Sequence, residues 1–405
     1  MKKTIWVINQ TAGTLDSGWG ERHLMFAKNW VKKGYDVKII SGSYNHLFKN
    51  QPLVSNKMFT IQPVEKGISF CWVKTPKYYD GGYRKFWSNF LFTLKVFFLP
   101  IKKLGKPSDI IVSSMPIFPI INGYFFKLRF KAQLIVEIRD LWPLTPIHLK
   151  GYSLKHPLII IVGWFEKFAY RKSDSIVSLL PNAAPYINAI SKDPSKFHWI
   201  PNGIDENLLE KEALSQSIIN QIPKNKFIIA YTGTMGMANA LEYFVEASKI
   251  LSNYNDIHFV MVGDGYLKPE LQKQTSGQNN ITFIEKISKA QVQTVLSYFD
   301  VCFIGRNNTP LFDFGVSSNK YFDYMLSKTP ILVSSNLIND PVERSQCGIT
   351  VKPESAQTIA DGILTFYNLP LAERKKMGEK AYDYVKKYHN FTVLSETYNS
   401  LFKNE

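Results

Sequence analysis

Short apolar runs that alternate with longer helical patterns are the feature that most constrains the fold of this 405-residue sequence. The runs have the length and the β-branched content of buried strands, and helical patterns follow them. Strands that alternate with helices form parallel sheets with both faces covered. The runs fall into two sets, 4–8, 36–40, 110–112, 133–138 and 175–179, then 227–232, 257–262, 281–283, 301–304 and 330–333.

Two sets of strands, in a chain longer than one hydrophobic core usually supports, predict two domains. The α/β pattern predicts two Rossmann-like, doubly wound parallel sheets that face a deep cleft. Pro201-Asn202-Gly203 is strong turn punctuation, so we place the boundary there. The predicted domains are residues 1–200 and 201–385, and we expect a final helix, about 385–405, to pack back onto the first domain.

The cysteines and the apolar segments indicate the compartment. Cys71, Cys302 and Cys347 are widely separated and form no CxxC motif, which favours a reducing compartment over a disulfide framework or a zinc site. The apolar run at residues 4–8 is too short for the core of a signal peptide. No apolar run reaches the length of a spanning helix. We therefore expect a cytoplasmic protein.

The positive charge lies entirely in the first half of the chain. Residues 1–200 contain 29 Lys and Arg against 11 Asp and Glu, a net charge of +18, whereas the remainder has 20 against 22, a net charge of −2. A basic half is typical of proteins that bind nucleic acid, anionic membranes or phosphorylated substrates. Two segments that combine aromatic and basic residues, 83–106 and 155–172, favour a membrane surface. Buried helices explain their apolar content equally well.

The segment 305–325 of the second half has the clearest signature of a ligand site. It starts at the carboxyl end of a predicted strand, where open α/β sheets bind ligands. A helix should begin at the cap-forming residues Ser317, Ser318 and Asn319. Lys320 then lies in the first turn, where a cation is unfavourable unless an anion is also bound. With Arg306 on the preceding loop, the segment predicts a phosphate site, against the alternative of a capped helix with a solvated lysine.

In each half of the chain, a glycine-containing loop follows the first predicted strand. Gly18 and Gly20 in the first half, and Gly233, Thr234 and Gly236 in the second, allow a ligand to approach the backbone at a helix start. Neither loop is a GxGxxG fingerprint, and a plain strand-to-helix turn explains the first loop about as well.

A charged pair follows another predicted strand of the first half. Arg139 and Asp140 come directly after the apolar run 133–138, so they emerge at its carboxyl end. Charged residues in that position favour a functional role over packing. A surface ion pair is the alternative.

Taken together, the chain resembles the family 4 retaining glycosyltransferases of the GT-B fold over nearly its full length, and within them the WbuB-like subgroup of O-antigen and capsule biosynthesis. The resemblance rests on an ordered set of segments. These are 17–23, Arg139-Asp140-Leu141-Trp142-Pro143, Pro201-Asn202-Gly203-Ile204-Asp205, 231–236, 262–265 and Phe314-Gly315-Val316-Ser317-Ser318-Asn319-Lys320-Tyr321-Phe322-Asp323-Tyr324-Met325.

The resemblance implies a nucleotide-diphosphate sugar held mainly by the second domain and an acceptor held by the first. Asp323 matches the carboxylate that holds the ribose, and residues 317–320 lie at the phosphates. Asp140 matches a position near the reacting sugar, which makes it the leading catalytic candidate, with Lys320 and Arg306 stabilising the diphosphate. The sequence departs from the family in two places. Gly315 stands where a first glutamate is usual, and residues 237–241 lack the usual Arg and Lys.

The sequence therefore predicts transfer of a sugar, an N-acetylated amino sugar, from a UDP-sugar to a polyprenyl-diphosphate-linked glycan. Transfer would retain the anomeric configuration, at the inner face of the cytoplasmic membrane, with no metal ion and no cofactor besides the UDP-sugar co-substrate. One alternative is a UDP-sugar 2-epimerase of the same fold, and another is a nucleic-acid-binding protein that uses the basic half. A phosphorylase with a lysine-bound cofactor fits less well.

Overall fold

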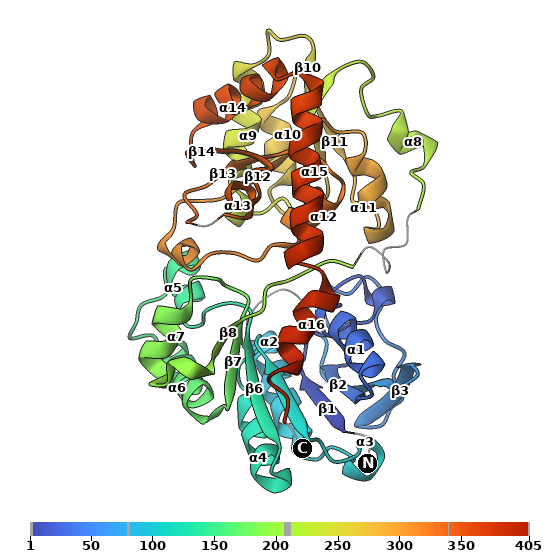
Figure 1. The fold of residues 1–405 in the computed structure, drawn as a ribbon, viewed down its shortest axis with the longest axis vertical. Helices are drawn as coiled ribbons and strands as arrows, with labels where there is room; N and C mark the ends of the chain where they lie inside the picture. Colours follow the sequence, from blue (N-terminus) through green and yellow to red (C-terminus); the bar gives the residue numbers. More distant parts are fainter. Residues whose placement is uncertain (1–2, 79–81, 206–211, 339, 404–405) are drawn as a thin grey trace. The chain divides into compact units, whose positions relative to one another are not determined.

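The computed structural model describes residues 3–78, 82–205, 212–338 and 340–403. The chain divides into two compact units, each built around one sheet (Figure 1). The first unit comprises residues 1–202 together with 391–405, and the second comprises residues 203–390.

The first unit contains an eight-stranded sheet in the order β3-β4-β2-β1-β5-β6-β7-β8. Its strands are parallel except for the edge strand β3, which runs antiparallel to β4. The predicted runs did not include β3, which is largely solvated, or β4. The strands are β1 (Thr4–Ile8), β2 (Asp36–Gly42), β3 (Phe59–Glu65), β4 (Ile68–Val73), β5 (Asp109–Ser113), β6 (Gln133–Ile138), β7 (Ser175–Ser178) and β8 (Phe197–Trp199).

Helices cover both faces of this sheet. One face carries α1 and α16, which lie side by side (Figure 1, blue and red) and join through stacked and edge-on rings of Phe26, Trp30 and Tyr398. On the other face Trp6 packs edge-on against Phe126 of α4. The helices are α1 (Arg22–Lys32), α2 (Gly82–Val96), α3 (Ile101–Leu104), α4 (Ile120–Phe130), α5 (Leu144–Lys150), α6 (Pro157–Lys172), α7 (Ala184–Ser191) and α16 (Phe391–Asn399).

The second unit contains a six-stranded parallel sheet in the order β11-β10-β9-β12-β13-β14. Alternate residues of β9 enter two separate hydrophobic clusters, one on each face. The strands are β9 (Phe227–Thr232), β10 (Ile257–Val262), β11 (Ile281–Ile284), β12 (Val301–Gly305), β13 (Ile331–Ser334) and β14 (Gly348–Val351).

The helices of the second unit end with α15, which packs against α12 and α13 and so belongs to this unit. The returning segment of the first unit therefore begins at Phe391. The helices are α8 (Gln216–Ile219), α9 (Leu241–Ile250), α10 (Lys268–Gln274), α11 (Lys289–Leu296), α12 (Asn319–Leu326), α13 (Pro341–Ser345), α14 (Ala356–Asn368) and α15 (Leu371–Tyr388).

Each sheet has one point at which the order of its strands reverses. In the second unit this point lies between β9 and β12, since β10 and β11 extend the sheet to one side and β13 and β14 to the other. In the first unit it lies between β1 and β5. Open α/β sheets bind ligands outside the carboxyl ends of the two strands at such a point.

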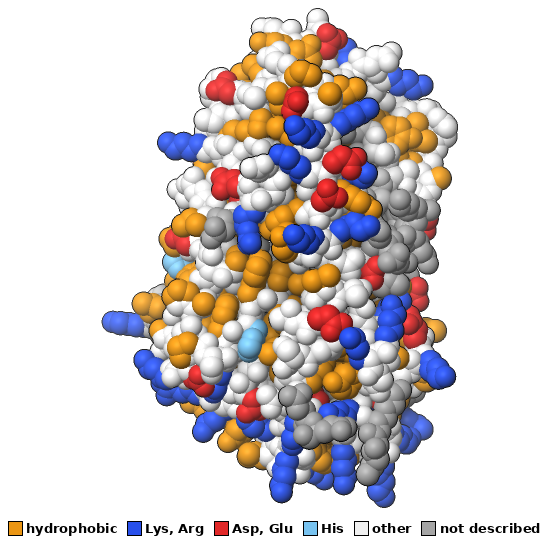
Figure 2. Space-filling model, viewed as in Figure 1, with side chains coloured by type: hydrophobic (Ala, Val, Ile, Leu, Met, Phe, Trp, Pro, Cys, Tyr) orange, Lys and Arg blue, Asp and Glu red, His pale blue; other side chains and the backbone are white. Residues whose placement is uncertain are grey.

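The surface reflects the uneven charge. On the side drawn in Figure 2, Lys and Arg crowd the first unit, whereas both signs are interspersed over the second unit. Among the described residues, no helix combines the length and the apolar character needed to cross a bilayer.

Candidate functional site

The loop after β9 runs along the strand-reversal point of the second unit. Gly233 has φ of +134°, a conformation that favours glycine. A methyl group on Gly233 would lie 2.5 Å from Cε of Lys320. A methyl group on Gly263, in the loop after β10, would lie 2.0 Å from the carbonyl oxygen of Gly233. The two loops therefore pack so closely that only glycine fits where they meet.

Thr234 and Gly236 complete this loop. The side chain of Thr234 is exposed, and its carbonyl oxygen accepts hydrogen bonds from the Tyr231 hydroxyl at 2.6 Å and the Asn239 amide at 3.0 Å. Gly236 precedes the short 3-10 helix η4 (Met237–Asn239). These bonds hold the loop in one conformation while the Thr234 side chain remains exposed.

Lys320 lies against this loop from the first turn of α12. Its Nζ donates to Oδ1 of Asn239 at 2.9 Å and lies 4.9 Å from the centre of the Tyr231 ring. Burial, and next the charge of Arg306, lower the pKa of Lys320 to about 7, against the opposing effect of Asp323. The loop thus holds Lys320 in an environment that disfavours its charge. This is expected of a lysine whose charge is stabilised when an anion binds.

The start of α12 carries polar residues whose side chains do not cap the helix. The helix begins at Asn319 with Ser318 as its N-cap, as predicted, but the Ser318 hydroxyl makes no capping hydrogen bond. Ser317 and Ser318 are half-buried, and Asn319 is exposed. A helix N-terminus whose cap side chain does not bond its own backbone offers N–H groups to a ligand.

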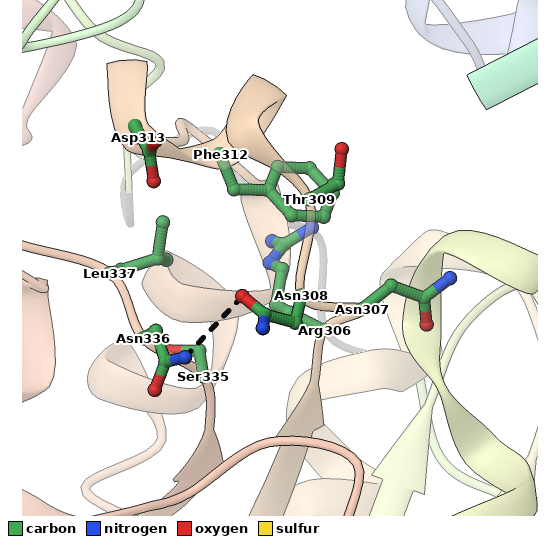
Figure 3. A pocket seen from close by; sticks show the side chains of 9 residues that line it. All are labelled: Arg306, Asn307, Asn308, Thr309, Phe312, Asp313, Ser335, Asn336 and Leu337. Carbon is green, nitrogen blue, oxygen red and sulfur yellow. Dashed lines mark hydrogen bonds between the residues drawn. The ribbon is translucent and has the colours of Figure 1, made fainter. Parts of the chain in front are cut away.

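Arg306 follows β12 on the other side of the strand-reversal point. Its guanidinium lies 5.4 Å from the centre of the Phe312 ring, and the buried Nε has no hydrogen-bond partner within the described part of the chain. Figure 3 shows this side chain in a small pocket walled by amide and hydroxyl groups. The lining residues are Arg306, Asn307, Asn308, Thr309, Phe312, Asp313, Ser335, Asn336 and Leu337.

Asp323 is buried one turn after Asn319 and is already paired. Nζ of Lys289, at the start of α11, donates to both carboxylate oxygens, at 2.5 and 2.6 Å. The carboxylate can still accept hydrogen bonds from ribose hydroxyls through its remaining lone pairs. Lys289 therefore orients the carboxylate, a role that the sequence did not reveal.

The predicted residues of the first unit lie at the carboxyl edge of its own sheet. Gly18 and Gly20 both have positive φ, 62° and 81°, in the loop that joins β1 to α1. Asp140 follows β6 and its side chain is exposed. The adjacent Arg139 is half-buried, and its backbone N–H donates to Oγ of Ser114 at 3.0 Å. These residues belong to the first unit, whereas Arg306, Lys320 and Asp323 belong to the second.

Comparison with known families matches the second unit. Residues 226–368 match the family described as Glycosyl transferases group 1. The matched segment contains Lys320, Arg306, Asp323 and the loop after β9. This part of the second unit is therefore similar to the group 1 glycosyltransferases.

The individual proteins that the chain resembles are distant. Alpha-D-kanosaminyltransferase of Streptomyces kanamyceticus is 22% identical over 270 residues, which cover 62% of this chain and 68% of that protein. Sucrose-phosphate synthase from Thermosynechococcus elongatus has a TM-score of 0.74 at 15% identity and covers 99% of this chain and 98% of its own. Anabaena Alr3699/HepE in complex with UDP has a TM-score of 0.66 at 12% identity, with 99% of each chain covered. These likenesses show that the two units have the GT-B fold.

A network around Glu137 in the first unit was not predicted. This carboxylate on β6 is buried and accepts hydrogen bonds from Arg22 at 3.0 Å, His23 at 2.9 Å, Ser113 at 2.8 Å and the Tyr398 hydroxyl. Arg22 also donates to the carbonyl oxygens of Ile200 and Pro201, at 2.8 and 2.6 Å. Glu137 thereby links α1 to α16 and, through Arg22, to the segment that contains Ile200 and Pro201. A carboxylate inside an otherwise apolar strand was the available signal, because a buried charge requires partners.

Replacing Asp323 by asparagine tests its assignment to the ribose. We expect binding of UDP to weaken about tenfold, since a charged acceptor is lost and Lys289 loses its partner. Binding of inorganic pyrophosphate, which has no ribose, should not weaken. Calorimetric titration with both ligands measures the difference. Lys289→Met serves as the comparison, and an equal loss for both ligands would contradict the assignment.

Proposed function

We propose that this protein is a retaining glycosyltransferase that moves a sugar from a UDP-sugar to a lipid-linked glycan. The observation that carries the proposal is the placement of Lys320 and Arg306 around the strand-reversal point of the unit that is similar to the group 1 glycosyltransferases. Within the described part of the chain, no carboxylate forms an ion pair with either side chain. Two cations at the ligand edge of a sheet suit a diphosphate.

The chemistry follows from this placement. As the glycosidic bond breaks, negative charge grows on the departing diphosphate, and cations already in position stabilise it without reorganisation. Lys320 would donate to the phosphate in place of its bond to Asn239, while Arg306 would use its unpartnered Nε. Asp140, exposed at the carboxyl edge of the first sheet, is our proposed catalytic residue on that unit, where a carboxylate would favour the positive charge that develops on the sugar.

The choice of donor and acceptor draws on the relatives. Structures of Anabaena Alr3699/HepE contain UDP or UDP-glucose, which supports a UDP-sugar donor. The kanosaminyltransferase supports an amino sugar, which we propose is N-acetylated. WaaG, a glycosyltransferase involved in lipopolysaccharide biosynthesis with a TM-score of 0.69 at 12% identity, supports a role in O-antigen or capsule synthesis. We place the reaction at the inner face of the cytoplasmic membrane, with a polyprenyl-diphosphate-linked acceptor and no metal ion or further cofactor.

Thermal unfolding with a panel of UDP, GDP, ADP, dTDP and CMP tests the donor site. A ligand that binds only the folded state stabilises it by about 2.7 kcal/mol at a hundred times its Kd, so UDP should raise the Tm and the others should raise it less. The panel is repeated in EDTA, where the same shift is expected. A folded protein that none of the nucleotides stabilises would contradict the proposal, and consumption of the UDP-sugar without an acceptor would favour a 2-epimerase.

A further inference from the structure

Helix α2 presents its apolar side chains to solvent. Its buried face is narrow and consists of Ser88, Phe92, Thr93 and Val96. The opposite face is a stripe with helical spacing, formed by Tyr83, Phe86, Trp87, Phe90 and Leu94, which are between 46% and 77% exposed. A surface helix normally buries its apolar stripe against the core. α2 instead turns most of its aromatic residues outward.

Helices α4 and α6 extend this surface. Leu128 of α4 is 62% exposed, and Ile160 and Trp164 of α6 are 60% and 56% exposed. Ring contacts join the three helices. Phe118, which precedes α4, touches Phe86 of α2 and Phe165 of α6, at centroid distances of 6.0 and 5.0 Å. We call the outward side chains of α2, α4 and α6 the aromatic surface. Exposed apolar side chains that gather on one protein surface indicate an interaction site.

The aromatic surface lies within a strongly basic segment. Residues 82–172 contain 15 Lys and Arg against 4 Asp and Glu, a net charge of +11. Three of the four acids, Asp109, Glu137 and Glu166, are buried. Glu166 is the only acid on the three helices and accepts from the Tyr186 hydroxyl at 3.0 Å. The surface is therefore bordered by cations, among them Arg84, Lys127, Arg129, Lys167, Arg171 and Lys172, without an exposed carboxylate on its helices.

We propose that the aromatic surface docks on an anionic phospholipid bilayer, with α2 lying in the plane of the interface. Outward Trp and Phe with basic residues at the margins suit the boundary between headgroups and acyl chains, where the rings enter the membrane and the cations meet the phosphates. A second copy of this chain would bring like charges together, which is unfavourable. The proposal rests on the proposed function only for its choice of the cytoplasmic leaflet, where the lipid-linked acceptor would lie.

Cosedimentation with vesicles tests the proposal on the full-length protein. We expect binding to vesicles that contain phosphatidylglycerol, weaker binding to phosphatidylcholine alone, and a decrease with added salt. The triple variant Trp87→Ser, Phe90→Ser and Trp164→Ser should bind at least about tenfold more weakly, since it removes the rings that insert. The matched control replaces Ile250, Tyr254 and Tyr298 by serine, which are 40% to 43% exposed in the second unit.

The nucleotide-induced Tm shift separates this proposal from the proposed function. The triple variant should keep the shift with UDP, because its substitutions lie in the other unit. Absence of vesicle binding by the native protein, or equal binding by the triple variant and the control variant, would overturn the docking surface and leave the donor site intact. A native dimer that the triple variant makes monomeric, without vesicle binding, would instead assign the surface to a second copy.

Discussion

Replacing Lys320 by methionine is expected to lower turnover by about 10²- to 10³-fold, the usual effect of removing one donor that stabilises a developing oxyanion. Methionine has a similar length and fits against the Tyr231 ring and Gly233, where a methyl group on the glycine would meet Cε of Lys320 at 2.5 Å. Because a desolvated cation is replaced by an apolar side chain, the Tm of the variant should not fall. Initial-rate measurement and thermal unfolding of the same preparation provide both values.

The pH dependence of UDP binding gives a second measurement of the same residue. The pKa of Lys320, lowered to about 7 by burial and Arg306, means that the free protein loses this charge as the pH rises above 7. A bound diphosphate favours the ammonium form and raises its pKa, so binding takes up a proton. The Kd for UDP should therefore increase, by up to about tenfold for each pH unit above 7. Phosphate is already fully ionised there, since its second pKa is about 6.

Two variants test whether Lys320 causes the pH dependence of UDP binding. Lys320→Met should bind UDP weakly with little dependence on pH between neutral and alkaline conditions. Lys328→Met, which changes an exposed lysine just beyond the end of α12 that pairs with Glu379, should behave as the native protein in rate and in pH profile. A Lys320→Met variant with native turnover would exclude Lys320 from diphosphate stabilisation.

The sequence predicted the parts of the fold that depend on local pattern. Continuous apolar runs such as residues 4–8 and 227–232 became strands at the predicted residues, because a strand buried on both faces must be apolar throughout. The edge strand β3 was missed because its residues Gln62, Pro63 and Glu65 are polar or break the pattern, as is common at a sheet edge. The start of α12 was predicted from cap residues, although Ser318 does not use its side chain to cap the helix.

The contacts that complete the candidate site depend on tertiary structure. Asn239 binds Lys320, and Lys289 binds Asp323, across 81 and 34 residues of sequence. No local pattern links residues so far apart. The sequence could indicate only that a residue's charge conflicts with its predicted environment. Examples are a cation in the first turn of a helix and a carboxylate within an apolar strand. Both conflicts mark residues that need a partner. The identity of the partner came only from the fold.

Glu137 leads to the prediction with the largest expected effect on stability. Its four hydrogen-bond partners, Arg22, His23, Ser113 and Tyr398, all act as donors. Glutamine at this position offers one acceptor oxygen and turns an NH₂ group toward donors, and Arg22 is left as a buried charge without a counterion. We expect Glu137→Gln to lower the free energy of unfolding of the first unit by about 3–5 kcal/mol, the usual cost of breaking a buried pair from one side.

Tryptophan fluorescence in urea measures this loss for the first unit alone. All eight tryptophans, Trp6, Trp19, Trp30, Trp72, Trp87, Trp142, Trp164 and Trp199, lie in the first unit, so their signal reports the unfolding of that unit. Glu396→Gln on α16 is the matched control, because its carboxylate pairs with Lys33 at the exposed surface and should contribute no measurable stability. A Glu137→Gln midpoint equal to that of the control would show that the network does not stabilise the unit.

The same network predicts how stability varies with pH. Burial alone would raise the pKa of Glu137, but Arg22 and His23, with hydrogen bonds from His23 and Tyr398, hold it well below its usual value of 4.5. A carboxyl whose pKa is lower in the folded state contributes its full stability above the unfolded pKa and loses it as the pH falls through the folded pKa. The difference in stability between the native protein and Glu137→Gln should therefore be constant near neutral pH and shrink below about pH 4.5. A stability difference that stays constant into strong acid would mean that the variant is destabilised by altered packing. The charge of Glu137 would then not be the cause.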